Sequence, residues 1–202
     1  MKPNRYPKKQ MCFLKPTELL ALLRAAKARG PREHAMILTA YLHGLRASEV
    51  CSLKLTDVDL RQGTIAVNRL KGSLSSVQEL HPHRGEPMLD EVRTLKTYLA
   101  AREDDGSGCL FLSQKGGAMA RQTFHALFQT LAEEAGIPEG KRHPHVLKHS
   151  VASHLIAENT NLAIVQRALG HRSISSTMIY VGVNDEQVTA EVNGALLRAF
   201  GR

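Results

Sequence analysis

Apolar residues recur at helical spacing along most of the chain. Between residues 124 and 135 they follow the i, i+3, i+4, i+7 order that places them on one face of a helix. Similar stripes occur elsewhere, bounded by glycines and prolines of the kind that end or begin helices. Thr17 is the expected N-cap of the first one. Further helices are expected over residues 17–30, 31–44, 47–53, 90–102, 145–159, 162–169, 175–180 and 186–200.

Two short segments change to a strand-like pattern. Thr64–Val67 and Val77–Leu80 are compact β-prone runs, and the polar stretch around Lys71-Gly72-Ser73 between them predicts a hairpin. A further short strand is expected over Cys109–Leu112. The pattern predicts an α+β fold that is mainly α-helical, with a small antiparallel sheet.

The chain shows no repeat, low-complexity tract or interdomain linker. Residues 1–15 are basic and contain Pro3 and Pro7, so we expect an arm that either contacts phosphates or remains solvated. Residues 16–202 are expected to form one domain. Its last helix, about 186–200, carries one apolar stripe, which packs either on its own domain or on a neighbouring protomer.

The charge balance favours an acidic partner. The formal net charge is +8 and the sequence pI is about 9.6, and nucleic acid is the commonest partner of such a protein. The three cysteines are far apart and odd in number, which argues against a disulfide framework and for a reducing compartment. No apolar run approaches the ~20 residues of a membrane helix. We therefore expect a cytoplasmic protein without membrane association.

Several polar side chains stand where chemistry is plausible. Arg46 begins a helix directly after a glycine break, so its guanidinium and nearby free N–H groups could hold a phosphate. Lys71 lies at the expected hairpin tip. His145 and Lys148 are three residues apart, and this spacing places them on one helical face. A histidine beside a cation suits a site that neutralises a phosphate and moves a proton.

A last cluster lies near the C-terminus. Gly170 ends a helix and leaves His171 in a turn, and Tyr180 follows nine positions later, so a short helix could bring the two together. His149 and His154 fall elsewhere on their helix, and packing or orienting neighbours is the expected role of both.

Four motifs occur in the order Gly-Leu-Arg-x-Ser-Glu-Val, a hairpin lysine, His-x-Leu-Lys-His and Leu-Gly-His-x-Ser-Ile-x-x-Thr-x-x-Tyr. In residue type, order and spacing they resemble the tyrosine-recombinase (phage-integrase) family, over roughly residues 14–185. The resemblance implies a DNA strand-transferase acting through a 3′-phosphotyrosine, with double-stranded DNA as partner and a tetramer assembled on paired sites. No cofactor is implied, because the phosphotyrosine conserves the bond energy needed for resealing.

The resemblance also implies residue roles. Tyr180 is the nucleophile, and a set of cations and hydrogen-bond donors stabilises the transition state. Lys71 protonates the leaving 5′ oxygen, His145 assists proton transfer to or from the tyrosine, and Glu49 supports the site from behind. The transition-state set is Arg46, Lys148 and His171.

Two features depart from the family pattern. The position of Lys148 is usually arginine, and lysine loses the planar fork that holds two phosphate oxygens at once. This favours a tolerated variant with altered activity, and a degraded, inactive copy is the competing interpretation. Only about 15 residues precede the catalytic region, so the chain resembles the small recombinases that invert fimbrial promoter switches. The alternative is a fragment of a longer integrase, but the start at Met1 favours a small recombinase.

Two other function classes remain open from the sequence. His81-Pro82-His83 and His143-Pro144-His145 could suggest a metal-dependent hydrolase, but no helical H-x-x-x-H or paired carboxylates accompany them. A DNA-binding regulator that keeps the recombinase fold without the chemistry is the second alternative, and Lys148 is its best support.

Overall fold

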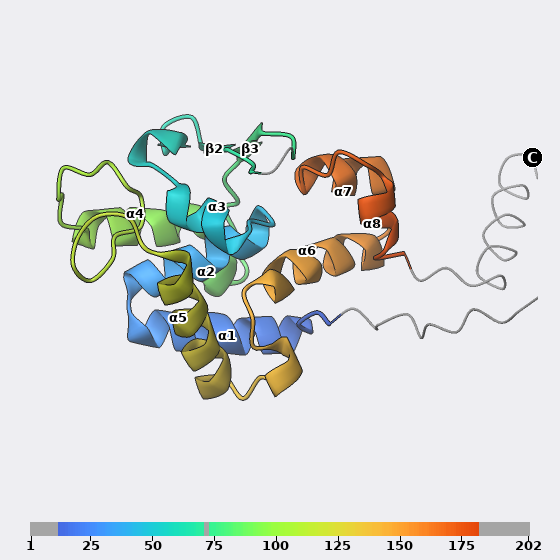
Figure 1. Ribbon diagram of the computed structural model, residues 1–202, viewed down its shortest axis with the longest axis horizontal. Helices are drawn as coiled ribbons and strands as arrows, with labels where there is room; N and C mark the ends of the chain where they lie inside the picture. Colours follow the sequence, from blue (N-terminus) through green and yellow to red (C-terminus); the bar gives the residue numbers. More distant parts are fainter. Residues whose placement is uncertain (1–11, 71–72, 182–202) are drawn as a thin grey trace, which may run out of the picture.

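The computed structural model describes residues 12–70 and 73–181. In these ranges the chain is mainly helical, with one small sheet and three short 3-10 helices (Figure 1). The helices are α1 (Pro16–Arg29), α2 (Pro31–Leu42), α3 (Ala47–Ser52), α4 (Glu91–Ala101), α5 (Arg121–Glu134), α6 (His145–Ala157), α7 (Leu162–Ala168) and α8 (Ser175–Met178). The strands are β1 (Val58–Asp59), β2 (Thr64–Val67) and β3 (Ser76–Glu79).

Helix α2 forms the centre of the fold. Its residues 35–40 are all buried, so the helix is surrounded on nearly every side rather than along one stripe. Helices α1, α3, α4 and α6 pack against it, and α5 packs on α1 and α3 (Figure 1). The expected mainly helical fold is confirmed, and its largest buried side chains include Phe111, Phe124 and Phe128.

The expected hairpin is also confirmed. Strands β2 and β3 pair antiparallel, with Ile65 opposite Gln78 and Val67 opposite Ser76. Ile65 and Val67 alternate into the core, as period two requires. The two-residue strand β1, which the pattern did not predict, pairs with the other edge of β2. Lys71 and Gly72 lie outside the described residues.

The structure corrects three local predictions. Cys109–Leu112 is not a strand; it contributes only two isolated bridges, from Cys109 to Lys54 and from Leu112 to Ala118. Gly108 and Gly116 have positive φ on either side of this segment and turn the chain away before a ladder can extend. The N-cap of α1 is Lys15, with Pro16 in the first turn, rather than Thr17. Helix α8 ends at Met178, two residues before Tyr180.

The hairpin contacts a segment nearly one hundred residues away. The Leu74 N–H donates to the Gly170 carbonyl at 3.1 Å, and Gln78 Nε2 donates to the Ala168 carbonyl at 3.1 Å. Figure 1 shows the hairpin beside α7, with α7 and α8 at one end of α6. The hairpin and the α7–α8 turn therefore meet, and Arg69, which follows β2, also reaches the α2–α3 turn through the Gly44 carbonyl. In the described ranges, no helix has both the length and the apolar content to cross a membrane.

Candidate active site

Arg46 links the turn after α2 to the first residue of α3. Its Nη1 donates to Glu49 Oε1 at 2.8 Å and to Ser73 Oγ at 3.2 Å, and its backbone N–H donates to Glu49 Oε2 at 2.8 Å. The Arg46 side chain is 31% exposed, while that of Glu49 is buried. The guanidinium is thus fixed by Glu49 and Ser73, while part of it remains accessible to a ligand from solvent.

Glu49 is the anion beneath this arginine. Burial by itself would raise its pKa, but hydrogen bonds from Arg46 and the charge of Arg69 hold that pKa below its usual value. Leu70 N–H donates a further bond at 3.3 Å. The carboxylate therefore stays ionised and bonds two arginines, Arg46 and Arg69.

Arg69 was missed by the sequence reasoning. Its side chain is fully buried, and its guanidinium donates to the carbonyls of His43 (2.7 Å), Gly44 (2.9 Å) and Ala168 (2.8 Å). A fourth bond reaches Glu49 at 3.2 Å. Arg69 thus joins the turn that leads to Arg46 with the turn that leads to His171. The sequence did contain a signal for this burial, because Arg69 follows Ile65 and Val67 at alternate positions, and alternate residues of a strand point to the same side.

Lys148 joins the same two turns. It is 1% exposed, and its Nζ donates to the carbonyls of Gly44 at 3.0 Å and Leu169 at 2.8 Å. Burial, with the charges of Arg69 and Arg46, lowers the pKa of Lys148 to about 7. The spacing places His145 and Lys148 on one face of α6, but their surroundings differ, because His145 is exposed and Lys148 is buried.

His171 lies in the turn that follows α7. Gly170 adopts φ +66°, and a Cβ there would come within 2.8 Å of the Leu74 carbonyl, so this turn requires glycine. His171 Nδ1 shares a 2.9 Å hydrogen bond with Thr177 Oγ1 of α8. Burial, then the charges of Lys148 and other cations, lowers the His171 pKa to about 4. Its ring is therefore neutral at pH 7.

Tyr180 is brought to His171, as the spacing suggested. The two rings are nearly parallel, at 7°, with centroids 6.4 Å apart. The Tyr180 ring also packs on the small apolar cluster that contains Val151, Val165 and Leu169. Burial raises the pKa of its hydroxyl to about 12, and the charge of Arg46 opposes this rise.

The second missed residue is His149. Its Nδ1 lies 2.9 Å from the Tyr180 hydroxyl, and its ring stands edge-on to that of His145 with centroids 4.4 Å apart. The i, i+4 spacing of the two histidines was a visible signal for the second contact. His154 instead bonds Tyr41 and the Leu14 carbonyl, which agrees with its expected packing role.

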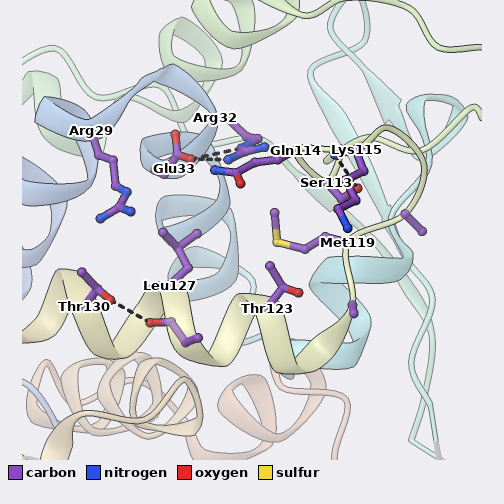
Figure 2. A pocket seen from close by; sticks show the side chains of 13 residues that line it. Arg29, Arg32, Glu33, Ser113, Gln114, Lys115, Met119, Thr123, Leu127 and Thr130 are labelled. Atoms are coloured by element: carbon purple, nitrogen blue, oxygen red, sulfur yellow. Dashed lines mark hydrogen bonds and ion pairs between the residues drawn. The ribbon is translucent and has the colours of Figure 1, made fainter.

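Two hollows lie on neighbouring faces of α5. One, of about 840 Å³, opens beside Arg46 and His145 and is also lined by Arg121, His125 and Gln129. The other, of about 510 Å³, is lined by Arg29, Arg32 and Lys115, and none of the described candidate catalytic residues reaches it (Figure 2). Figure 2 shows Arg32 turned onto Glu33, and the two form a 2.6 Å ion pair.

Residues 12–70 and 73–181 contain no cluster of side chains that could hold a metal ion. No three His, Cys, Asp or Glu side chains gather there as metal ligands. The His81 ring lies against His43, with centroids 5.6 Å apart. His83 Nδ1 accepts from the Glu86 N–H.

Known proteins resemble this chain over most of its length. The Phage integrase family model matches residues 12–187. The type 1 fimbriae regulatory protein FimB of Escherichia coli K12 is 35% identical, with 90% of this chain and 89% of that protein covered. The corresponding FimE is 32% identical, with 85% and 86% covered.

Solved structures agree with the sequence matches. The XerA recombinase superposes with a TM-score of 0.76 at 28% identity, covering 94% of this chain and 66% of that one. The XerH recombinase bound to its difH substrate gives 0.75 at 25% identity, covering 94% and 56%. The chain thus spans about two thirds or less of these structures and nearly all of the fimbrial relatives. On these matches the protein belongs to the phage integrase family, as a site-specific tyrosine recombinase.

Proposed function

We propose that this protein cleaves and rejoins double-stranded DNA through a covalent bond between Tyr180 and a 3′ phosphate. The observation that carries the proposal is the convergence on Tyr180. Its hydroxyl bonds His149, its ring lies parallel to His171, and Arg46 is near enough to influence its pKa. A phenol beside cations and imidazoles suits nucleophilic attack on a phosphate.

The surrounding residues divide the remaining work. Arg46 and His171 donate to the phosphate oxygens and stabilise the charge of the transition state, and Lys148 supplies a further positive charge from below. Lys71 protonates the departing 5′ oxygen, and His145 takes part in proton transfer at the tyrosine. No metal or nucleotide is required by this scheme, because the phosphotyrosine retains the energy of the broken bond.

A covalent-capture experiment tests this function. The wild-type protein is incubated with a pool of nicked duplexes that carry the inverted repeats flanking its gene, and adducts are recovered under denaturing conditions. We expect an adduct with wild type, none with Tyr180→Phe, and DNA binding by both. Tyr98→Phe is the matched control, because it removes a hydroxyl bonded to the Leu110 carbonyl instead. An adduct with Tyr180→Phe contradicts the mechanism.

The 840 Å³ hollow is the proposed DNA surface. It joins the accessible guanidinium of Arg46 to basic and amide side chains of α5, a composition suited to phosphates and base edges. The XerH relative is described with its DNA substrate bound. Such a protein would act on the nucleoid in the cytoplasm.

Assembly into a tetramer on paired sites completes the proposal. Residues 186–202, whose sequence predicts an apolar helical stripe, lie outside the described residues and are proposed to dock on a neighbouring protomer. Deleting them should leave a folded protein that binds one site but loses cooperative pairing and ordered strand exchange. A deletion that unfolds the protein, or that recombines normally, contradicts this proposal.

A DNA-binding regulator without chemistry is the second candidate. One observation favours it: Lys148, which replaces the usual arginine, bonds two backbone carbonyls and is buried. The FimB and FimE relatives are themselves named regulatory proteins. The capture experiment decides, because a regulator of this kind forms no adduct.

A further inference from the structure

We propose that His149 is the group that accepts the Tyr180 proton as the phenolic oxygen attacks the phosphate. This inference rests on the proposed function and deepens it by naming the base. In the forward step the Tyr180 O–H bond breaks, its proton moves to His149 Nδ1 and the O–P bond forms, while the bond from phosphorus to the 5′ oxygen breaks and that oxygen takes the proton that the proposed function assigns to Lys71. In rejoining, the incoming 5′ hydroxyl gives its proton back to Lys71 and displaces Tyr180 from phosphorus, and His149 returns its proton to the Tyr180 oxygen.

The contact supplies the geometry that such a transfer requires. Nδ1 of His149 lies 2.9 Å from the reacting oxygen, within the range expected of a positioned base. The phenol is the better donor of the pair and a neutral imidazole nitrogen the better acceptor, so the hydroxyl donates. Burial, with the nearby His145 and other cations, lowers the His149 pKa to about 4, which leaves the ring neutral at pH 7.

The other two histidines are placed differently. His171 uses Nδ1 in its bond with Thr177, so Nε2 is the nitrogen left to donate to a phosphate oxygen. His145 is exposed and meets His149 edge-on, and the ring nitrogen that contacts the Tyr180 hydroxyl belongs to His149. His145 can therefore act on the phosphate or relay the proton onward, whereas His149 is the ring in direct contact with the nucleophile.

A bound phosphate raises the basicity of His149 above its value in the free protein. There, the pKa of Tyr180 is about 12 and that of His149 about 4, so the proton stays on oxygen. The charge of Lys148 contributes to the low pKa of His149, and the charge of Arg46 lowers the pKa of Tyr180. A DNA phosphate offsets the positive charge felt by His149 and raises its basicity at the moment of attack, and the forming O–P bond, rather than a free phenolate, takes up the electrons of the Tyr180 oxygen.

Asparagine provides a matched substitution at this position. Its side-chain oxygen lies near the place of Nδ1 and can accept the Tyr180 hydrogen bond, but it cannot take the proton. If His149 only positions Tyr180, His149→Asn should form the adduct at nearly the wild-type rate. If His149 is the base, the single-turnover rate should fall about 10²-fold or more, with DNA binding unchanged.

The test uses a nicked duplex that the wild-type protein captures covalently from the inverted-repeat pool. A second duplex of the same sequence carries sulfur in place of the leaving 5′ oxygen, and this leaving group needs no proton. We expect His149→Asn to remain slow on both duplexes and Lys71→Ala to recover on the sulfur duplex. Near-normal cleavage by His149→Asn, or its rescue by sulfur, overturns the proposal.

Two further results separate the failures. If wild type captures no duplex at all, the proposed function fails first, and with it the base. If His149→Asn no longer binds DNA, His149→Gly is measured with and without added imidazole. Recovery of adduct formation by imidazole supports the base, and its absence contradicts the base.

Discussion

Replacing Arg69 by methionine should loosen the two turns that carry the active site. The buried guanidinium bonds three carbonyls, of His43, Gly44 and Ala168, together with the Glu49 carboxylate. Removing one partner of a buried ion pair costs about 3–5 kcal/mol. We expect the lower part of this range, because Glu49 keeps its bonds from Arg46 and from the Leu70 N–H.

The loss is large enough to measure without abolishing the fold. A domain unfolds with about 5–15 kcal/mol, so Arg69→Met should remain folded in the absence of denaturant. With a urea m-value of about 3 kcal/mol/M, in the upper part of the range for a chain of 202 residues, the midpoint should fall by about 1–1.3 M. Arg69→Lys keeps the charge but not the fork, and should lose about 1–3 kcal/mol.

Arg61→Met is the matched control, because it makes the same chemical change at an exposed position. Urea unfolding followed by circular dichroism, with the three variants side by side, gives the midpoints. If Arg69→Met lies within about 0.2 M of Arg61→Met, the guanidinium does not hold the turns together. A fall in adduct formation by folded Arg69→Met would extend the argument from stability to the site.

Three other measurements test the remaining charges. Lys148→Ala should lower the cleavage rate ~10²–10³-fold and Lys148→Arg should retain or raise it; equal rates for lysine and alanine would place residue 148 outside the chemistry. Lys148 binds its proton less tightly in the folded state, where its pKa is about 7, than in the unfolded state, where it has the ordinary lysine pKa of 10.5, so the unfolded state holds more protons between these values. Unfolding free energy should therefore rise as pH increases from about 7 to about 10, and Lys148→Met should lack that part of the rise. DNA binding should weaken steeply with salt, as expected of a chain with net charge +8, and a log–log slope near zero in a titration would contradict phosphate contacts.

The helices and the residue types of the site could be predicted from the sequence because both are local. A stripe such as Phe124, Phe128 and Leu131 specifies a helix and its buried face through spacing alone. Likewise, the nine-residue interval from His171 to Tyr180 leaves room for only a short helix, which brings the rings together. The hairpin followed from two β-prone runs with polar residues between them.

The contacts between distant segments were decided only by the tertiary structure. Arg69 and Lys148 each bond carbonyls from two turns that are more than one hundred residues apart, and backbone carbonyls carry no mark in the sequence. The failed strand at Cys109–Leu112 has the same cause, since a strand exists only where a partner runs beside it. The contact between His149 and the Tyr180 hydroxyl is also tertiary, because the chain after α8 brings Tyr180 back to the side of α6 on which His149 lies. Spacing along one element determines which residues share a face, and packing between elements determines what that face meets.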